Sequence, residues 1–211
     1  LISKSDLALE IHNMTDHKTD TLFVLEGARR IVFPVSRLVV DPERFIEDSM
    51  ESLGMGVVYT HTADGRPLRH ISEAERQELI DIYYHPHHHK LTQMVDVCLA
   101  EYDSCLIIDC HSFSSHPLPY EQDTNRPDIC IGTCDFHTSE ELISSLSEAF
   151  SSMGYEVAIN SPYSGTIVPL KHYYKDHRVS SVMLEINRRL YKSSADYLKL
   201  QGHLSEVMSR L

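Results

Sequence analysis

The segment from Cys105 to Ser115 constrains the fold of this chain more than any other. Its apolar run, Cys105-Leu-Ile-Ile, has the length of a strand buried on both faces, and it ends in Asp109, Cys110 and His111. Because side chains alternate along a strand, we expect Asp109 and His111 on one face and Cys110 on the other. Ligands of open α/β sheets bind beyond such strand ends, and an Asp beside a His fixes the imidazole tautomer for a metal ion or a proton transfer. The alternative is a polar end to a core strand, with His111 only hydrogen-bonded.

The rest of the chain predicts alternating strands and helices. Ser72-Glu-Ala-Glu75 is a capping box that starts a helix, and Pro86 fits the first turn of a second helix. Asp64-Gly65 is typical of a turn between two strands. The predicted strands cover 28–40, with a kink at Pro34, both halves of 54–66, and 105–111, 127–133, 155–160 and 180–188; the predicted helices cover 5–23, 72–84, 86–102, 139–153 and 193–211. This alternation indicates a single α/β domain over residues 1–211.

The composition excludes several classes of protein. With 211 residues, of which 42% are hydrophobic, the chain is long enough to bury a substantial core. Its formal net charge of -12 argues against nucleic acid as a partner, because phosphate binding needs a basic surface. No apolar stretch approaches membrane-spanning length and the start shows no signal-peptide pattern, so we expect a cytoplasmic protein. The five cysteines are scattered without a CxxC pair, which favours reduced thiols over disulfides or cysteine-bound zinc.

Two arginines flank an apolar strand end in this acidic chain. A guanidinium binds a carboxylate through two parallel hydrogen bonds, and each charged hydrogen bond contributes about 1.5–3 kcal/mol. Arg37 and Arg44 are therefore candidates for binding a substrate carboxylate. The alternative is that they pair with Asp41 and Glu43, which lie between them in the sequence.

Other histidines and acids are weaker candidates. In Asp16-His17-Lys-Thr-Asp20, His17 and Asp20 share a helix face and form a possible ligand pair, although a solvated helix face is the commoner explanation. The tract His85-Pro-His-His-His89 fans around a helix, so its histidines cannot all bind one ion, and only His88 is retained.

Two further segments are suited to a site. Glu185 lies inside the apolar run 180–188, where burial raises a carboxylate pKa and a nearby cation lowers it, so a general base can be tuned there. The loop 161–169 combines small residues with an aromatic and is suited to admitting a ligand, while the proline-containing loop 117–126 is typical of an active-site wall.

Taken in order, these motifs resemble the N-formylglutamate amidohydrolase family nearly from end to end. The arginine segment and the Asp-x-His-Ser-Phe motif are specific, whereas the Gly-Thr pair would be weak by itself. The motifs that carry the resemblance are Asp16-His-Lys-Thr-Asp20, Ser36-Arg-Leu-Val-Val-Asp-Pro-Glu-Arg44, Gly54-Met-Gly56, Tyr84-His-Pro-His-His88, Asp109-Cys-His-Ser-Phe-Ser114, Gly132-Thr133 with His137-Thr138, Gly165-Thr-Ile-Val-Pro169 and Glu185-Ile-Asn-Arg-Arg-Leu-Tyr191.

The family is similar to zinc carboxypeptidases and aspartoacylases. The resemblance therefore implies a three-layer α/β fold of the phosphorylase/hydrolase-like type, with a mixed, mostly parallel sheet between helices and one catalytic zinc per chain. It implies His111 and Asp20 as metal ligands, with Asp109 behind them and His17 as a weaker candidate.

The resemblance also implies roles in the reaction. Glu185 is expected to be the base that activates metal-bound water, and Arg37 and Arg44 are expected to bind the substrate carboxylate. The remaining expected substrate contacts are Gly165, Thr166, His88 and Asn187, with His88 alternatively supporting the site from behind. Zinc with three protein ligands keeps an open position and lowers the pKa of bound water to about 7, and a carboxylate then moves a proton to the leaving amine. The implied reaction releases formate from N-formyl-L-glutamate in amino-acid catabolism, in particular histidine degradation.

One departure from the family leaves alternatives open. Members open with a strand ending in a Pro-His-Ser-Gly-type motif, expected to give a further zinc ligand, and no such segment precedes Asp16. Either this sequence lacks its natural start, which Leu1 in place of Met favours, or this member has lost a ligand. The candidate functions are hydrolysis of N-formyl-L-glutamate, the same hydrolysis of a linear amide in another N-acyl amino acid or a peptide-like substrate, and a catalytically silent carboxylate-binding homologue. The expected partner is a small-molecule substrate, with neither nucleic acid nor membrane.

Overall fold

The computed structural model describes all 211 residues, and they form two compact units. The first unit contains Leu1–Thr15, Ile31–Gln93 and Leu118–Glu121, and the second contains Asp16–Arg30, Met94–Pro117 and Gln122–Leu211. The sequence predicts one domain over the same 211 residues. The division has a physical basis, because each unit has its own clusters of buried apolar side chains.

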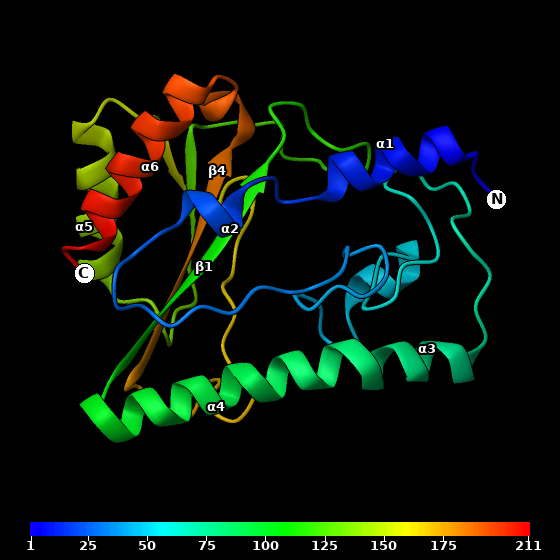
Figure 1. Cartoon of the computed structure of the whole chain (residues 1–211), viewed down its shortest axis with the longest axis horizontal. Helices are drawn as coiled ribbons and strands as arrows, with labels where there is room; N and C mark the ends of the chain where they lie inside the picture. Colours follow the sequence, from blue (N-terminus) through cyan, green and yellow to red (C-terminus); the bar gives the residue numbers. More distant parts are fainter. The chain divides into compact units, whose positions relative to one another are not determined.

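The helices and strands alternate along the chain, mainly in the second unit (Figure 1). The first unit contains α1 (Lys4–Met14), the 3-10 helix η1 (Ser49–Leu53), α3 (Glu73–Leu79), the π-helical segment η2 (Ile80–Tyr84) and the start of α4 (His85–Tyr102). The second unit contains the end of α4, and α2 (Thr19–Leu22), β1 (Cys105–Phe113), β2 (Ile129–Gly132), α5 (Glu140–Ser152), β3 (Val157–Ile159), β4 (Val179–Asn187), the 3-10 helix η3 (Arg188–Tyr191) and α6 (Ser194–Met208). None of the helices combines the length and the apolar composition that crossing a membrane requires.

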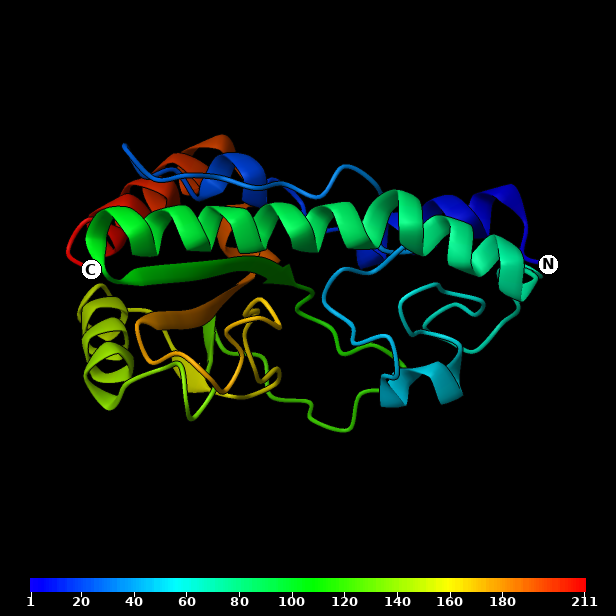
Figure 2. The ribbon, with the colours of Figure 1, turned by 90° about the horizontal axis from the view of Figure 1, so that it is seen from below.

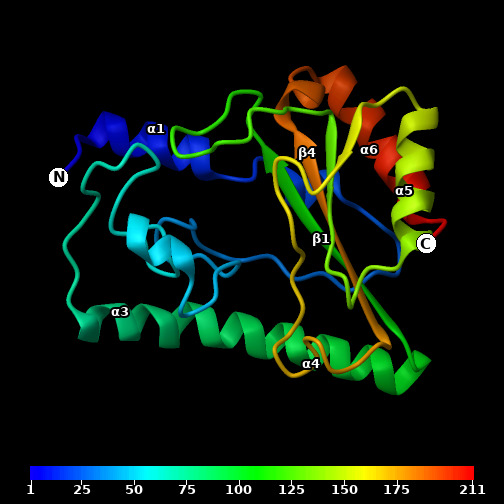
Figure 3. The ribbon, with the colours of Figure 1, turned by 180° about the vertical axis from the view of Figure 1, so that it is seen from behind.

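The sheet of the second unit is mixed and mostly parallel, as predicted. Its strand order is β1-β4-β2-β3, with β1 parallel to β4, β2 parallel to β3, and β4 antiparallel to β2. The two longest strands, β1 and β4, lie side by side (Figure 3). Their register runs from the Cys105–Val179 pair to the Phe113–Asn187 pair.

Helices cover both faces of this sheet, which confirms the predicted three-layer α/β fold. On one face, Ile108, Leu184 and Ile186 pack with apolar residues of α2, α5 and α6. On the other face, Val95 and Leu99 of α4 pack with apolar side chains that include Cys105, Ile107 and Val179. The strands β1 and β4 thus contribute alternate side chains to two separate layers.

The predicted break between two helices at Pro86 is wrong, because α3, η2 and α4 form one uninterrupted helix (Figure 2). The capping box does form: the Ser72 hydroxyl accepts from the Glu75 amide, and the Glu75 carboxylate accepts from the Ser72 amide. Proline lacks an N–H, and its ring clashes with the carbonyl four residues earlier in an α-helix. Directly before Pro86 the helix contains a π-turn, in which the His85 amide donates to the Ile80 carbonyl five residues earlier. The wider turn moves the preceding carbonyls relative to the Pro86 ring, so the helix continues through the proline.

The predicted strands at 28–40 and 54–66 are also wrong. Residues 28–40 form turns and extended segments without strand pairing. In place of the two strands predicted within 54–66, a single isolated bridge joins His61 to Pro67 around the expected turn at Asp64-Gly65. Arg69 supplies the reason, since its guanidinium takes the hydrogen-bonding capacity that a neighbouring strand would use. It donates to the carbonyls of Tyr59, Leu38 and Val39 at 2.7, 2.8 and 2.9 Å.

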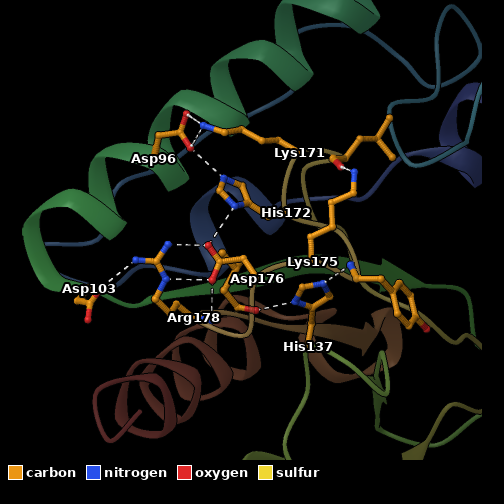
Figure 4. Close-up of polar contacts among 11 residues, drawn as sticks. Asp96, Asp103, His137, Lys171, His172, Lys175, Asp176 and Arg178 are labelled. Atoms are coloured by element: carbon orange, nitrogen blue, oxygen red, sulfur yellow. Dashed lines mark hydrogen bonds and ion pairs between the residues drawn. The ribbon is translucent and has the colours of Figure 1, made fainter.

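Charged side chains fasten the long segment between β3 and β4 to α4 (Figure 4). Asp96 on α4 lies 2.7 Å from Lys171 Nζ and 2.8 Å from His172 Nε2. Arg178 lies 2.8 Å from Asp176 and 2.9 Å from Asp103, which directly follows α4. These contacts fix the end of α4 against the start of β4.

Gly132 at the end of β2 is required by close packing. A Cβ there would collide with the Cε of Met183 and the backbone oxygen of Gly165. We expect Gly132→Ala to destabilise the fold by about 1–3 kcal/mol in urea unfolding, because the backbone oxygen cannot rotate away. The matched control is Gly202→Ala on α6, where a Cβ meets nothing, and it should stabilise by roughly 0.5–1 kcal/mol. A Gly132→Ala protein as stable as the wild type would contradict the packing argument.

Candidate active site

His111 lies near the carboxyl end of β1 between two carboxylates. Its Nε2 is 2.9 Å from Asp109 Oδ1, and its Nδ1 is 3.4 Å from Asp16 Oδ2. The imidazole is 12% exposed. Cys110, between Asp109 and His111, packs instead into the helix-covered core of the opposite face. The structure thus brings Asp109 and His111 together on one face of the strand.

Asp109 holds the imidazole and a loop at the same time. One of its carboxylate oxygens faces His111, and the other accepts a hydrogen bond from the Ile167 amide at 3.0 Å. The Asp109 side chain is 8% exposed. With both oxygens engaged by fixed groups, Asp109 orients the ring and leaves Nδ1 facing Asp16.

Asp16, which the sequence analysis passed over in favour of Asp20, is the acid that meets His111. Its Oδ1 accepts from the backbone amide of Ser112 at 2.7 Å and is 3.3 Å from the Ser112 hydroxyl. Asp20 lies on α2 with an exposed side chain, and its backbone carbonyl accepts from Arg30. The structure thus favours Asp16 over Asp20 as the acidic partner of His111.

The pKa of His111 is raised well above its ordinary value. Burial lowers it, because burial disfavours the charged imidazolium. The negative charges of Asp109 and Asp16 and their hydrogen bonds outweigh that effect. A metal ion on a ring nitrogen requires a neutral imidazole, so binding would release this proton.

The donor atoms here suit a metal ion. Asp109 and His111 offer a carboxylate oxygen and an imidazole nitrogen within 4.8 Å of one another. The 3.4 Å between His111 Nδ1 and Asp16 Oδ2 is long for a hydrogen bond. It matches the separation of about 3.3 Å between two ligands that each lie about 2.0–2.1 Å from a tetrahedral zinc ion. The spacing of His111 Nδ1 and Asp16 Oδ2 is therefore compatible with two ligands of one ion, while Asp109 faces the other ring nitrogen.

Glu185 lies beside His111 on the neighbouring strand. The register of β1 and β4 pairs the two residues, and parallel strands lie about 4.8 Å apart, so both side chains leave the same face of the sheet. Glu185 is 8% exposed. Cys130 on β2 is the antiparallel partner of Glu185. Burial raises the pKa of Cys130 to about 11, and the charge of Glu185 contributes to this increase. A buried carboxylate next to the imidazole is well placed for proton transfer.

The loop 161–169 is fastened to this face of the sheet. Thr166 Oγ1 is 2.7 Å from the Ser181 hydroxyl, which donates to the Ile167 carbonyl at 2.8 Å. Gly165 adopts a φ of 88°, which favours glycine. The predicted ligand loop therefore touches the site through the Ile167 amide on Asp109, and Thr166 anchors it.

Asn187 is fully buried, and its amide group is bonded to protein. Its Nδ2 donates to the Pro127 carbonyl at 2.9 Å. Its Oδ1 accepts from the Ser115 hydroxyl at 2.9 Å and from the Arg189 amide at 3.1 Å. These contacts favour a role in holding loops together over the predicted direct contact with substrate.

The first unit has a charged cluster of its own, around the fully buried Asp41. Its Oδ2 accepts from the Tyr59 hydroxyl at 2.9 Å and lies 3.7 Å from Arg44 Nε, and its Oδ1 accepts from the Glu43 amide at 3.0 Å. Burial opposes the charge of Arg44, but Tyr59, Asp41 and Asp48 together raise its pKa. Arg44 thus has the acidic partner that the sequence analysis gave as an alternative to substrate binding.

The charges of Arg37 and Arg44 both influence the phenols of Tyr59 and Tyr120. Burial raises the pKa of Tyr59 and of Tyr120, while the positive charges of both arginines lower it. The two guanidiniums therefore share one neighbourhood within the first unit, as the predicted carboxylate-binding pair requires.

His88 and Tyr84, one helical turn apart, support the segment that carries Arg44. His88 Nε2 is 3.0 Å from the Pro42 carbonyl, and the Tyr84 hydroxyl donates to the Arg44 carbonyl at 2.8 Å. Burial lowers the pKa of His88, which keeps the imidazole neutral, and the Pro42 hydrogen bond opposes this. Of the two predicted roles for His88, this arrangement favours support from behind.

A sequence profile of the N-formylglutamate amidohydrolase family matches residues 3–192. The chain belongs to this family. An N-formylglutamate amidohydrolase from Ralstonia eutropha has the same fold, with a TM-score of 0.77 at 22% identity over 100% of this chain and 85% of that one. A gene product of Agrobacterium tumefaciens gives a TM-score of 0.62 at 20% identity over 83% of this chain and 67% of that one. A comparison with curated protein sequences gives no match.

Family membership rests on the profile match over residues 3–192, whereas spacing within single motifs does not identify every residue of the site. Helical spacing within the motif 16–20 favours His17 and Asp20 over Asp16. Tyr191, the last residue of the motif that begins at Glu185, was given no role, yet its hydroxyl donates to the His17 carbonyl at 3.0 Å and so holds the turn that carries Asp16. No local pattern singles out Asp16, because α2 begins at Thr19 with Lys18 as its N-cap and the partners of the Asp16 carboxylate lie on β1.

Proposed function

We propose that this chain is a metal-dependent amidohydrolase that cleaves the amide of N-formyl-L-glutamate or a similar N-acyl amino acid. The products are formate, or another carboxylate, and the free amino acid. The observation that carries the proposal is His111, held between Asp109 and Asp16 beside Glu185 at the end of a central strand. Membership of the family supports the reaction class, and ends of buried strands are where α/β enzymes place their ligands.

His111 and Asp16 would hold the metal, and Asp109 would keep the His111 ring in place through Nε2. Nitrogen and oxygen donors suit zinc, which when bound lowers the pKa of water to about 7 and polarises a carbonyl. Ser112 holds Asp16 by donating its amide and hydroxyl to the same oxygen. These contacts keep the donors oriented without relying on the ion itself.

Glu185 would supply the proton transfer. As water adds to the formyl carbon, the Glu185 carboxylate takes a proton from it and then delivers this proton to the amide nitrogen. The C–N bond breaks, the formyl group leaves as formate, and the nitrogen leaves as the amine of glutamate. Because Glu185 is 8% exposed, bulk water competes little for that proton.

The carboxylate-binding role of Arg37 is testable separately. We expect Arg37→Gln to raise KM for N-formyl-L-glutamate about tenfold to a hundredfold with a smaller change in kcat, because one charged hydrogen bond contributes about 1.5–3 kcal/mol. Arg37 is a better test than Arg44, because removing Arg44 also strips buried Asp41 of a counter-charge. The control is Arg66→Gln, an exposed arginine paired with Asp64, which should leave KM unchanged. An unchanged KM in Arg37→Gln would exclude this role.

The test of the function is metal content together with formate release. Purified protein is analysed for metal and assayed on N-formyl, N-acetyl and N-succinyl amino acids, before and after treatment with a chelator. We expect about one zinc per chain and turnover that chelation abolishes and zinc restores. Turnover that resists the chelator would exclude the metal mechanism, and a preference for acetyl or succinyl substrates would change the substrate class.

A further inference from the structure

Two of the five free cysteines lie against each other, away from the candidate active site. Cys98 is in the last turns of α4, and Cys105 is the first residue of β1. Cys98 Sγ donates at 3.3 Å to the carbonyl of Ser104, the residue directly before Cys105, so the two thiols lie near each other. Both residues are half-buried, so small solutes reach them.

The turn between the two cysteines is built to hold them together. Asp103 adopts a left-handed φ of 57°, and its amide donates to the Leu99 carbonyl at 2.9 Å, which ends α4 and reverses the chain. The Arg178 guanidinium donates to the Asp103 carboxylate at 2.9 Å (Figure 4). The backbone carbonyl of Arg178 accepts a hydrogen bond from the Cys105 amide at 2.8 Å. The two thiols are thus fixed on two elements that meet at one point.

Charge assigns different roles to the two thiols. Burial and the neighbouring Cys98 side chain raise the pKa of Cys105 to about 12, while the nearby cation Arg29 lowers it. A thiol with a raised pKa is the poorer nucleophile, so Cys98 is assigned the first attack and Cys105 the second. Arg29, which is 2.7 Å from Glu101, lies near Cys105 and lowers its pKa.

We propose that Cys98 and Cys105 form a redox-active dithiol that low-molecular-weight disulfides oxidise to an intramolecular disulfide. The Cys98 thiolate attacks one sulfur of the oxidant and forms a mixed disulfide, and one thiol leaves. Cys105 then loses its proton and attacks Cys98 Sγ, which closes the new bond and releases the second thiol. Two electrons pass from the cysteine pair to the oxidant. The proposal is independent of the proposed hydrolytic function.

The test is equilibration of the folded full chain in glutathione redox buffers. The thiols are trapped with acid and alkylated, and peptides are then examined by mass spectrometry. We expect a Cys98–Cys105 crosslink, with Cys110, Cys130 and Cys134 alkylated. Because a short loop also closes in an unfolded chain, the same titration is run in urea. The native pair should have an effective concentration at least about tenfold higher than the unfolded one.

Serine variants separate the two roles. Cys105→Ser should accumulate the mixed disulfide on Cys98, whereas Cys98→Ser should react slowly, and Cys134→Ser should crosslink as the wild type does. Circular dichroism establishes that each variant is folded. A native effective concentration equal to or below that in urea, or two separate mixed disulfides without a crosslink, would overturn the proposal.

Discussion

Asp16→Asn is expected to abolish most release of formate from N-formyl-L-glutamate, with turnover at least about a hundredfold below the wild type. Asn keeps the shape of the side chain but loses the negative charge that faces His111 Nδ1 at 3.4 Å. It also loses a carboxylate donor of the proposed metal site. Zinc affinity, measured by competition with a chromogenic chelator, should fall together with turnover.

The matched variant is Asp20→Asn, the acid that helical spacing favours. Its exposed position on α2 predicts turnover and zinc affinity close to those of the wild type. The reverse result, with Asp20→Asn impaired and Asp16→Asn active, would mean that the spacing argument is right and that the observed contact with His111 is not functional. Equal loss in both would point to damage to the shared turn, which circular dichroism would detect.

Glu185→Gln should lower kcat by about 10²–10⁴-fold while leaving zinc content unchanged, because it removes a proton acceptor and not a proposed metal donor. The amide has nearly the same volume, so packing beside His111 on the neighbouring strand is preserved. Steady-state formate release and metal analysis of the same preparation measure the two effects separately.

The control for Glu185→Gln is Glu148→Gln on α5, an exposed position, which should have wild-type kinetics. A catalytically silent homologue that only binds carboxylates predicts something different. In that case the wild type shows no turnover to lose, and Glu185→Gln changes ligand affinity alone. Turnover that survives the substitution would exclude Glu185 as the base, and it would not test the proposed metal ligands.

Sequence patterns predicted the second unit well because its elements depend on local patterns. The apolar run before Asp109 forms the first half of β1, and Ser139 caps the N-terminus of α5 by accepting from the Leu142 amide. In the first unit the helix after Ser72 was predicted, but the strand patterns failed. The residues around Leu38 and Tyr59 look like strands, but their carbonyls are bonded by the distant Arg69, a contact that propensity does not contain.

By itself, the sequence determined that Asp109 and His111 share one face of a buried strand, because the alternation of side chains is a property of any strand. It also specified the helix after Ser72, through a capping box that spans four residues, Ser72 to Glu75. Tertiary packing determines which acid meets His111, because Asp16 lies 95 positions away in the chain and reaches it through the packing of the whole unit. The register that sets Glu185 beside His111 is likewise decided between strands, where hydrogen bonds and buried faces select one alignment.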